Sequence, residues 1–310
     1  MGRNLSFRHP LAIALGGGGA RGALQVGALR ALFEHGVRPD ILVGTSIGAV
    51  NAAYLALHGV NLEGLKALEQ AWFEAAEANL LPANYLWLTV QVLFERIGRR
   101  TDHRMRDFFV QHGLTPELTF GDLQNIRLFL VAADLNSGEP LLYGTSPHQS
   151  ILEGLVASTA LPPWVHPLDQ EGRLLIDGGV VSNLPIEPAY RQGAKEIIAL
   201  DLIDPRMVTA PTTPSFGHFI AKLINTVEQR QLELELELAT AHQVPVWHIR
   251  LQGEKAVPIW DFSQTGELIE RGYQITLVEI QKKLAEQPLQ WHRWLQERIK
   301  FPFRQEYQRS

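Results

Sequence analysis

The chain has 310 residues, 45% of them hydrophobic and 20% charged, so it can bury a substantial core. Its formal net charge of −5 argues against general nucleic-acid binding through long-range attraction. The absence of cysteine excludes disulfides, thiol catalysis and cysteine metal sites, and is compatible with a reducing, cytoplasmic compartment. No spacing of His or carboxylate residues is typical of a metal site, so we expect no metal.

The first expected unit is a strand, a glycine loop and a helix. Leu11 to Leu15 is a short apolar run, the glycines 16–19 follow it, and a helix is expected from about Ala20 to Glu34. Without Cβ atoms the N–H groups of such a loop can turn toward a ligand, and the positive end of the helix dipole adds to their effect. The loop is therefore a candidate oxyanion hole or phosphate cradle.

Nucleotide binding is an alternative for this loop. Gly17, Gly19 and Gly22 fit the G-x-G-x-x-G dinucleotide pattern, which also requires an acidic residue after the second strand. The candidate, Asp40, precedes that strand. A P-loop would need Lys after Gly22, where the chain has Ala23. A glycine-rich tight turn without a ligand is the remaining alternative.

A candidate nucleophile follows the second expected strand, Ile41 to Val43. The segment 44–48 has the G-x-S-x-G pattern and places Ser46 on a sharp turn between a strand and a helix. The glycines Gly44 and Gly48 flank it because a side chain there would collide with neighbouring elements. The sequence therefore predicts a hydrolase nucleophile at Ser46.

The connection between the two strands predicts an oxyanion hole. Parallel strands joined through a helix are almost always neighbours with a right-handed crossover, so the glycine loop should lie beside the Ser46 turn. An ester carbonyl attacked by Ser46 would then face the N–H groups of Gly18 and Gly19, with that of Ile47 assisting.

A mainly helical insertion is expected over about residues 62–124, where it could cap the site. Its apolar stretch from Tyr85 to Phe94 could touch acyl chains or a membrane surface, and packing on the core is the alternative. Beyond it, Arg127 to Asp134 and Pro140 to Tyr143 are expected to form strands paired through the turn at residues 136–138.

A candidate base comes after the short strand from Arg173 to Ile176. Asp177, Gly178 and Gly179 put a carboxylate on a turn that allows close approach, and a carboxylate can serve a serine directly as base if burial adjusts its pKa. A plain hairpin turn is the alternative for this tripeptide.

Together these residues resemble the patatin-like phospholipases. That family has a G-G-G-x-[KR]-G loop, a G-x-S-x-G turn and, more than a hundred residues later, a D-G-[AG] turn. They correspond here to residues 17–22, 44–48 and 177–179, and the flanking stretches 49–53, 157–162 and 180–185 are also similar to the family. The resemblance covers roughly residues 10–205.

The resemblance implies a serine–aspartate dyad. Ser46 would be the nucleophile and Asp177 the base, and the glycine loop, with Gly17, Gly18 and Gly19, would be the oxyanion hole. Arg21 is the cation of the motif, and it would either fix the loop or meet a lipid phosphate.

A catalytic histidine is the alternative to the dyad. His242 or His248 would complete a Ser-Asp-His order, but neither lies in a recognisable motif.

The last third of the chain has no recognisable motif, and its patterns predict secondary structure alone. Lys195 to Leu202 and Val244 to Leu251 are expected to be strands, and residues 218–241 and 265–287 helices. Within the first helix, Leu232 to Leu238 alternates with Glu as a strand would, but Leu and Glu both favour helix. The basic and aromatic tail, residues 291–310, suits a membrane interface or a docked helix.

We therefore expect a three-layer α/β/α sandwich with a mainly parallel sheet. Residues 1–205 would form the catalytic domain, and residues 206–310 would complete it or pack on it. The family resemblance implies a lipid acyl-ester hydrolase of the phospholipase A or lysophospholipase type. The expected mechanism needs no cofactor, and the basic and aromatic tail suits peripheral membrane contact. The alternative is a non-catalytic lipid-binding protein that retains the fold.

Overall fold

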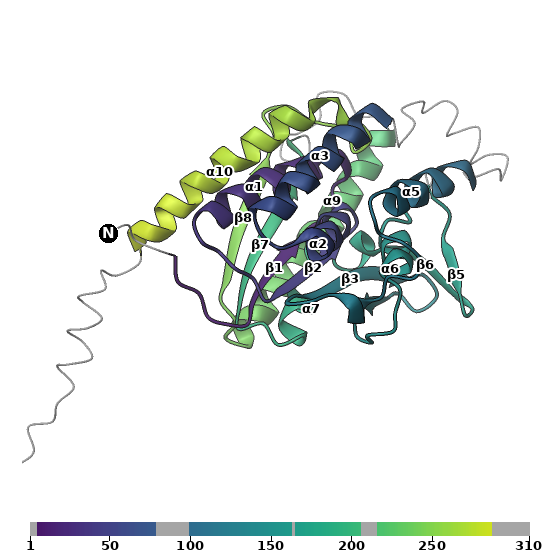
Figure 1. Ribbon diagram of the computed structural model, residues 1–310, viewed down its shortest axis with the longest axis horizontal. Coiled ribbons are helices and arrows are strands. Elements are labelled where there is room, and N and C mark those ends of the chain that lie inside the picture. Colours follow the sequence, from purple (N-terminus) through teal and green to yellow (C-terminus); the bar gives the residue numbers. More distant parts are fainter. Residues whose placement is uncertain (1–4, 79–98, 163–164, 206–215, 287–310) are drawn as a thin grey trace, which may run out of the picture.

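The computed structural model describes residues 5–78, 99–162, 165–205 and 216–286, in which one sheet has helices on both faces (Figure 1). The strands are β1 (Leu11–Leu15), β2 (Ile41–Thr45), β3 (Arg127–Asp134), β4 (Glu139–Tyr143), β5 (Leu168–Gln170), β6 (Arg173–Asp177), β7 (Glu196–Ile203) and β8 (Val246–Gln252). The helices are α1 (Ala23–Glu34), α2 (Ile47–His58), α3 (Leu62–Ala78), α5 (Arg99–Gln111), α6 (Ile151–Ser158), α7 (Ile186–Arg191), α9 (Phe216–Ala241) and α10 (Thr265–Glu286).

The strand order is β5-β6-β3-β2-β1-β7-β8, and β4 also pairs with β3. The strands β3, β2, β1, β7 and β8 are mutually parallel, whereas β4, β5 and β6 are added by antiparallel pairing. The expected α/β fold with a mainly parallel sheet is confirmed.

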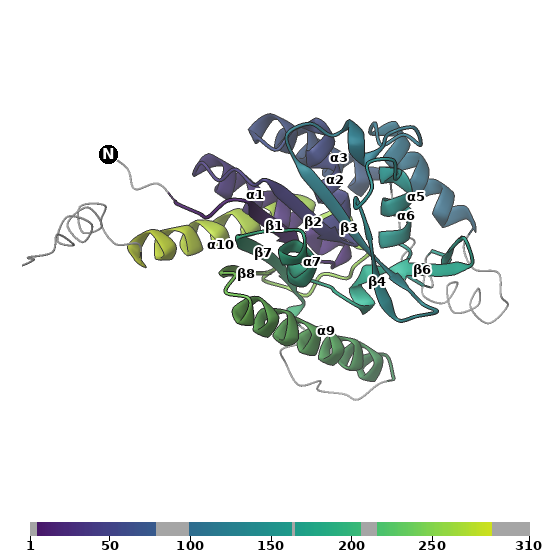
Figure 2. The same cartoon turned by 90° about the horizontal axis from the view of Figure 1, so that it is seen from below.

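Side chains of β1 alternate between the two faces of the sheet, as the period of a strand requires. Leu11, Ile13 and Leu15 belong to a core shared with α1, α2, α3 and α10. Ala12 and Ala14 belong to a second core shared with α7 and α9. Figure 2 shows α9 on one side of the strands and α1, α2 and α3 on the other, which are the outer layers of the expected sandwich.

The register of β3 brings two distant segments together. β2 pairs with residues 127–131 of β3 and β4 with residues 130–134, so these strands lie on opposite edges of β3. β6 pairs with residues 132–134, which β4 also contacts, so β6 lies on the same edge of β3 as β2 and follows the end of β2. Because β6 is antiparallel to β3, the carboxyl ends of β2 and β6 point at each other, at Thr45 and Asp177.

Two glycines allow α1 and α10 to touch through their backbones. A Cβ atom on Gly27 of α1 would collide with the carbonyl oxygen of Ile269, and one on Gly272 of α10 would collide with that of Leu24. Helix α10, yellow in Figure 1, thus lies directly against α1.

The expected strands and helices of the last third are present. The alternating stretch 232–238 lies within α9, so helix propensity prevails over the strand-like period. The elements β5, α6 and α7 were not expected, because they have 3, 8 and 6 residues and are too short for a periodic signal.

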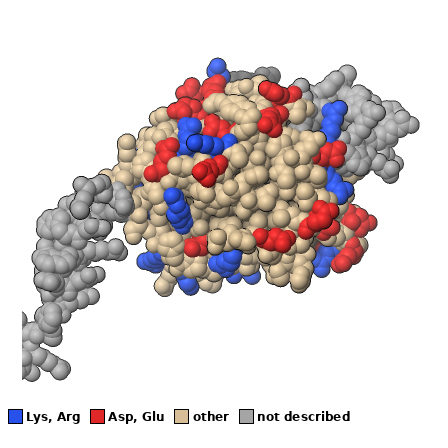
Figure 3. Space-filling view, in the orientation of Figure 1, with Lys and Arg blue, Asp and Glu red and all other residues tan. Residues whose placement is uncertain are grey.

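Two expected features, the apolar stretch from Tyr85 to Phe94 and the tail at residues 291–310, lie outside the described residues. No helix among the described residues is both long and apolar enough to cross a membrane. On the face seen in Figure 3, acidic and basic side chains are interspersed.

Gly272→Ala should destabilise the protein, because its Cβ atom would meet backbone that moves only if α1 and α10 separate. Overpacking of this kind costs about 1–3 kcal/mol. Gly266→Ala in the same helix is the matched control, since its Cβ atom would lie 3.6 Å from the Phe73 ring. Circular-dichroism melting should show a lower Tm for Gly272→Ala and an unchanged or higher Tm for Gly266→Ala. An equal Tm for both variants would contradict the backbone contact.

Candidate active site

Ser46 occupies a strained turn between β2 and α2. Its φ of 55° and ψ of −125° lie in a region that a residue other than glycine seldom adopts. Its N–H donates to the Ser158 hydroxyl at 3.0 Å, and that hydroxyl donates to the Val131 carbonyl at 2.6 Å. Its carbonyl accepts from the N–H groups of Ala49 and Val50. These contacts hold Ser46 in place despite the strain.

The glycines around Ser46 are required by close backbone contacts. A Cβ atom on Gly48 would collide with the carbonyl oxygen of Leu15 at the end of β1, and one on Gly44 would collide with the carbonyl of Gly48. The start of α2 therefore lies directly on the end of β1, and Ser46 lies beside the glycine loop.

Asp177 meets Ser46 across the junction of β2 and β6. Its carboxylate accepts a hydrogen bond from the Gly179 N–H at 2.8 Å and also interacts with the Ser46 side chain. The side chain is buried, and this desolvation raises its pKa to about 6, although the interactions with Ser46 and Gly179 act in the opposite direction. A carboxylate of this kind is ionised near neutral pH and is still a stronger base than an exposed aspartate.

Gly17 was assigned to the oxyanion loop, and its N–H donates to the Asn183 carbonyl at 3.0 Å. Within the part of the chain that the structure describes, the N–H groups of Gly18, Gly19 and Ile47 donate to no acceptor. They remain the candidate oxyanion donors.

Arg21 holds the glycine loop. Its Nε atom donates to the Gly18 carbonyl at 3.1 Å, and its guanidinium forms an ion pair with the buried Asp204 at 3.1 Å. Because the peptide unit is planar and trans, fixing the Gly18 carbonyl also fixes the opposite direction of the Gly19 N–H. These contacts fit the expectation that Arg21 fixes the glycine loop, which was one of its two expected roles.

A buried polar network that the sequence analysis missed joins both ends of the loop. The Gln25 side chain donates to the Gly16 carbonyl at 2.9 Å, and the Asn51 side chain donates to the Gly22 carbonyl at 3.1 Å and to Gln25 at 3.0 Å. The Trp72 indole N–H donates to Asn51 at 2.8 Å. Two amides within the apolar helices α1 and α2 were the available signal, since buried amides need such partners.

A cavity of about 1350 Å³ opens at Ser46 and Asp177. Its apolar wall includes Tyr54, Leu68, Trp72, Phe108, Phe109 and Phe262. Asp201, Asp204, Glu228 and His248 line another part of it. The cavity can thus take a substrate with a long apolar portion.

The two histidines weighed as a third catalytic residue have other partners. The Nε2 atom of His248 lies 2.9 Å from an Asp201 carboxylate oxygen, and the ring of His242 stacks on Tyr190. Among the described residues, neither is hydrogen-bonded to Asp177, and no group of three or more acidic or histidine side chains is placed to hold a metal.

The nucleotide alternative fails on position. Asp40 accepts from the Leu11 N–H at 2.6 Å, at the amino end of β1, whereas the glycine loop follows the carboxyl end of that strand. This carboxylate is a strand length away from any ribose bound at the loop.

A family model described as patatin-like phospholipase matches residues 13–190, more than half of the chain. The chain belongs to the patatin-like phospholipase family. It is 30% identical over 203 residues to mouse patatin-like phospholipase domain-containing protein 7, and 33% identical over 201 residues to human patatin-like phospholipase domain-containing protein 6. It is 30% identical over 200 residues to the Drosophila melanogaster neuropathy target esterase sws.

These matches cover 63% of this chain and 13–14% of each relative, so the chain spans about a seventh of their length. Among solved structures it is similar to VipD from Legionella pneumophila, with 15% identity and a TM-score of 0.48 over 90% of this chain and 68% of that chain. It is also similar to ExoU of Pseudomonas aeruginosa in its complex with SpcU, with 17% identity and a TM-score of 0.44 over 90% and 52%.

Asp177→Asn should stabilise this patatin-like domain at high pH. A carboxyl pKa raised from 3.8 to about 6 costs the folded state about 3 kcal/mol once the group is ionised in both states. Since the folded state holds the proton to higher pH, this cost grows as pH rises from about 3.8 to about 6 and is constant above that. Urea unfolding should therefore show a larger gain for the variant at about pH 8 than at about pH 5. An equal gain at both pH values would contradict the raised pKa.

Proposed function

We propose that this chain is a serine acyl hydrolase acting on lipid esters, with Ser46 as nucleophile and Asp177 as general base. The observation that carries the proposal is the interaction of the Ser46 side chain with the buried carboxylate of Asp177, whose pKa is raised. Membership of the patatin-like phospholipase family supports it, as do the names phospholipase and esterase among the relatives.

Acylation begins when Asp177 takes the Ser46 proton and the Ser46 oxygen attacks the ester carbonyl. The negative charge that develops on the carbonyl oxygen is met by the N–H groups of Gly18, Gly19 and Ile47. Collapse of the tetrahedral intermediate breaks the bond to the alcohol oxygen, which takes the proton from Asp177. An acyl-enzyme on Ser46 remains.

Deacylation uses the same groups in reverse. Asp177 takes a proton from water, the water oxygen attacks the acyl carbonyl, and the bond to Ser46 breaks. Ser46 regains its proton, and the fatty acid is released. Asp177 thus accepts and donates a proton once in each half of the cycle, and no step requires a cofactor.

The cavity favours a lipid over a small ester. Aromatic and aliphatic side chains of α2, α3 and α5 form a wall that suits an acyl chain, and Ser46 lies in the same cavity. We propose phospholipid or lysophospholipid as substrate, and a cytoplasmic enzyme that contacts membranes peripherally to reach it. On the face in Figure 3, mixed charges give little attraction to an anionic surface, so apolar contacts would dominate there.

A fluorophosphonate probe tests the nucleophile, because it forms a covalent bond with an activated serine. We expect labelling of the native protein and none of Ser46→Ala, with hydrolysis of a soluble ester lost in Ser46→Ala and reduced at least about 10³-fold in Asp177→Asn. Mass spectrometry of a mixed lipid extract would identify the lipid that is cut. A native protein that is neither labelled nor active on any ester would be a non-catalytic lipid-binding protein.

The pH profile tests the base. Because Asp177 must be ionised to accept the proton and its pKa is about 6, kcat/KM should fall about tenfold per pH unit below pH 6 and level off above it. A soluble ester is the substrate of choice, since its solubility does not change with pH. A midpoint near the ordinary aspartate value of 3.8 would exclude Asp177 as the titrating base.

A further inference from the structure

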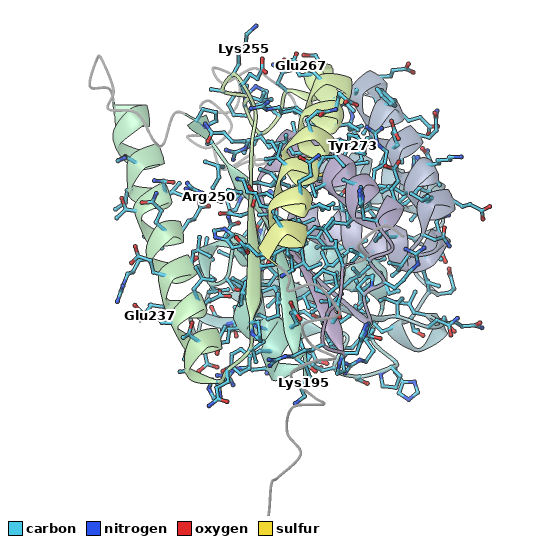
Figure 4. The ribbon with its side chains drawn as sticks, turned by 90° about the vertical axis from the view of Figure 1, so that its left-hand side faces the viewer. Lys195, Glu237, Arg250, Lys255, Glu267 and Tyr273 are labelled. Atoms are coloured by element: carbon cyan, nitrogen blue, oxygen red, sulfur yellow. The ribbon has the colours of Figure 1, made fainter. Side chains whose placement is uncertain are left out.

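Glu235 is a buried carboxylate in the part of the chain where no sequence motif was found. It lies on α9, within the alternating stretch of Leu and Glu, and is 6% exposed. Its neighbours in the repeat, Glu233 and Glu237, are exposed, and Figure 4 shows Glu237 on the outer side of α9. One of three similar glutamates therefore faces the protein interior.

Both carboxylate oxygens of Glu235 are engaged. The Ser182 hydroxyl donates to Oε1 at 2.6 Å, and the N–H groups of Ile186 and Glu187 donate to Oε2 at 2.7 and 2.9 Å. Those N–H groups begin α7 and have no partner within that helix. Glu235 thus fastens the segment 182–187 to α9.

The same segment contacts all three catalytic motifs. The Ser182 carbonyl accepts from the Thr45 hydroxyl at 2.8 Å, directly before the nucleophile. The Ser182 N–H donates to the Gly178 carbonyl at 2.9 Å, directly after the base. The Asn183 carbonyl accepts the Gly17 N–H, in the glycine loop. The segment 182–187 is therefore a common support for the nucleophile, the base and the oxyanion donors.

We propose that Glu235 is a positioning residue for the acyl-transfer site, which it holds together by fixing the segment 182–187 against α9. The proposal rests on the proposed function, because it concerns the geometry of the same reaction. Glu235 touches neither Ser46 nor Asp177 and acts on them through Ser182 and Asn183.

The energetics favour this role over simple packing. Burial raises the pKa of Glu235 to about 7, the hydrogen bonds from Ser182, Glu187 and Ile186 oppose this rise, and the nearby charge of Glu187 adds to it. A buried carboxyl group with fewer partners would destabilise the fold, and an apolar residue here would leave three donors without an acceptor. The three hydrogen bonds that Glu235 accepts thus offset the cost of burying its carboxylate, and they hold the donors in place.

A comparison of Glu235→Gln with Glu235→Leu distinguishes the effect of the hydrogen bonds from the effect of the charge. The Gln side chain can accept both N–H groups at its oxygen and donate to Ser182 from its amide, so we expect kcat on a soluble ester within about 3-fold of wild type. Leu makes none of these bonds, and small displacements of reacting groups lower rates by up to about 10²-fold, so we expect kcat to fall at least about 10-fold. KM should change less than kcat in either variant, because the apolar wall formed by α2, α3 and α5 does not include the segment 182–187.

Glu237→Leu is the matched control, since it places the same side chain on the exposed side of α9 and should leave kcat unchanged. Native-like kcat in a folded Glu235→Leu variant would overturn the proposal. Loss of kcat in Glu235→Gln equal to that in Glu235→Leu would also overturn it, because the contacts would then not be what matters.

Ser182→Ala decides the case if Glu235→Leu does not fold. It removes one hydroxyl link to Glu235 and keeps the Ser182 carbonyl that Thr45 contacts. We expect slower fluorophosphonate labelling and lower kcat, by about 3-fold or more, with an unchanged KM. Labelling of Ser182→Ala at the wild-type rate would overturn the proposal. No labelling of wild type would instead overturn the proposed function itself, and this inference with it.

Discussion

The shared edge of β3 is the constraint on which the site depends. β3 extends three residues past the end of β2, and this overhang is filled by β6 arriving from the opposite direction. A strand parallel to β2 and paired beside it would have its carboxyl end one strand spacing away from that of β2. Because β6 runs in the opposite direction along the same edge of β3, its carboxyl end faces the carboxyl end of β2 directly. Strand pairing across about 130 residues of chain brings Ser46 and Asp177 together, and the glycines of the two turns allow the close backbone approach that this requires.

The loops at this edge have irregular backbone, and those of their polar groups that are buried need hydrogen-bond partners within the protein. Side chains on regular elements supply them: Gln25 from α1, Asn51 from α2, Thr45 from β2 and Ser158 from α6. The glycine loop and the Ser46 turn are therefore held by rigid elements. Such support keeps the candidate donors and the nucleophile in one geometry before a substrate arrives.

The sequence predicts what local chemistry determines. The strands around the glycine loop and Ser46 follow from apolar runs and glycines, and the helix over residues 232–238 follows from propensity. The N–H of Gly17 could not be assigned, because its acceptor, Asn183, is 166 positions away and carries no signal of the contact. Glu235 was equally hidden, since a Leu-Glu repeat does not reveal which glutamate turns inward. These contacts depend on how α7 and α9 pack, which a single sequence leaves open.

The orientation of α9 about its own axis also depends on these contacts, as the burial of its side chains shows. In its observed position Glu235 is buried, while Leu234 and Leu238 are 42% and 38% exposed. Burial of a leucine is worth about 1.5–3 kcal/mol, and burial of a carboxylate is unfavourable, so apolar packing alone would favour turning a leucine inward. The inward side chains Leu232, Leu236 and Ala239 oppose such a turn. The hydrogen bonds of Glu235 oppose it as well, and they tie the orientation of this helix to the geometry of the catalytic loops.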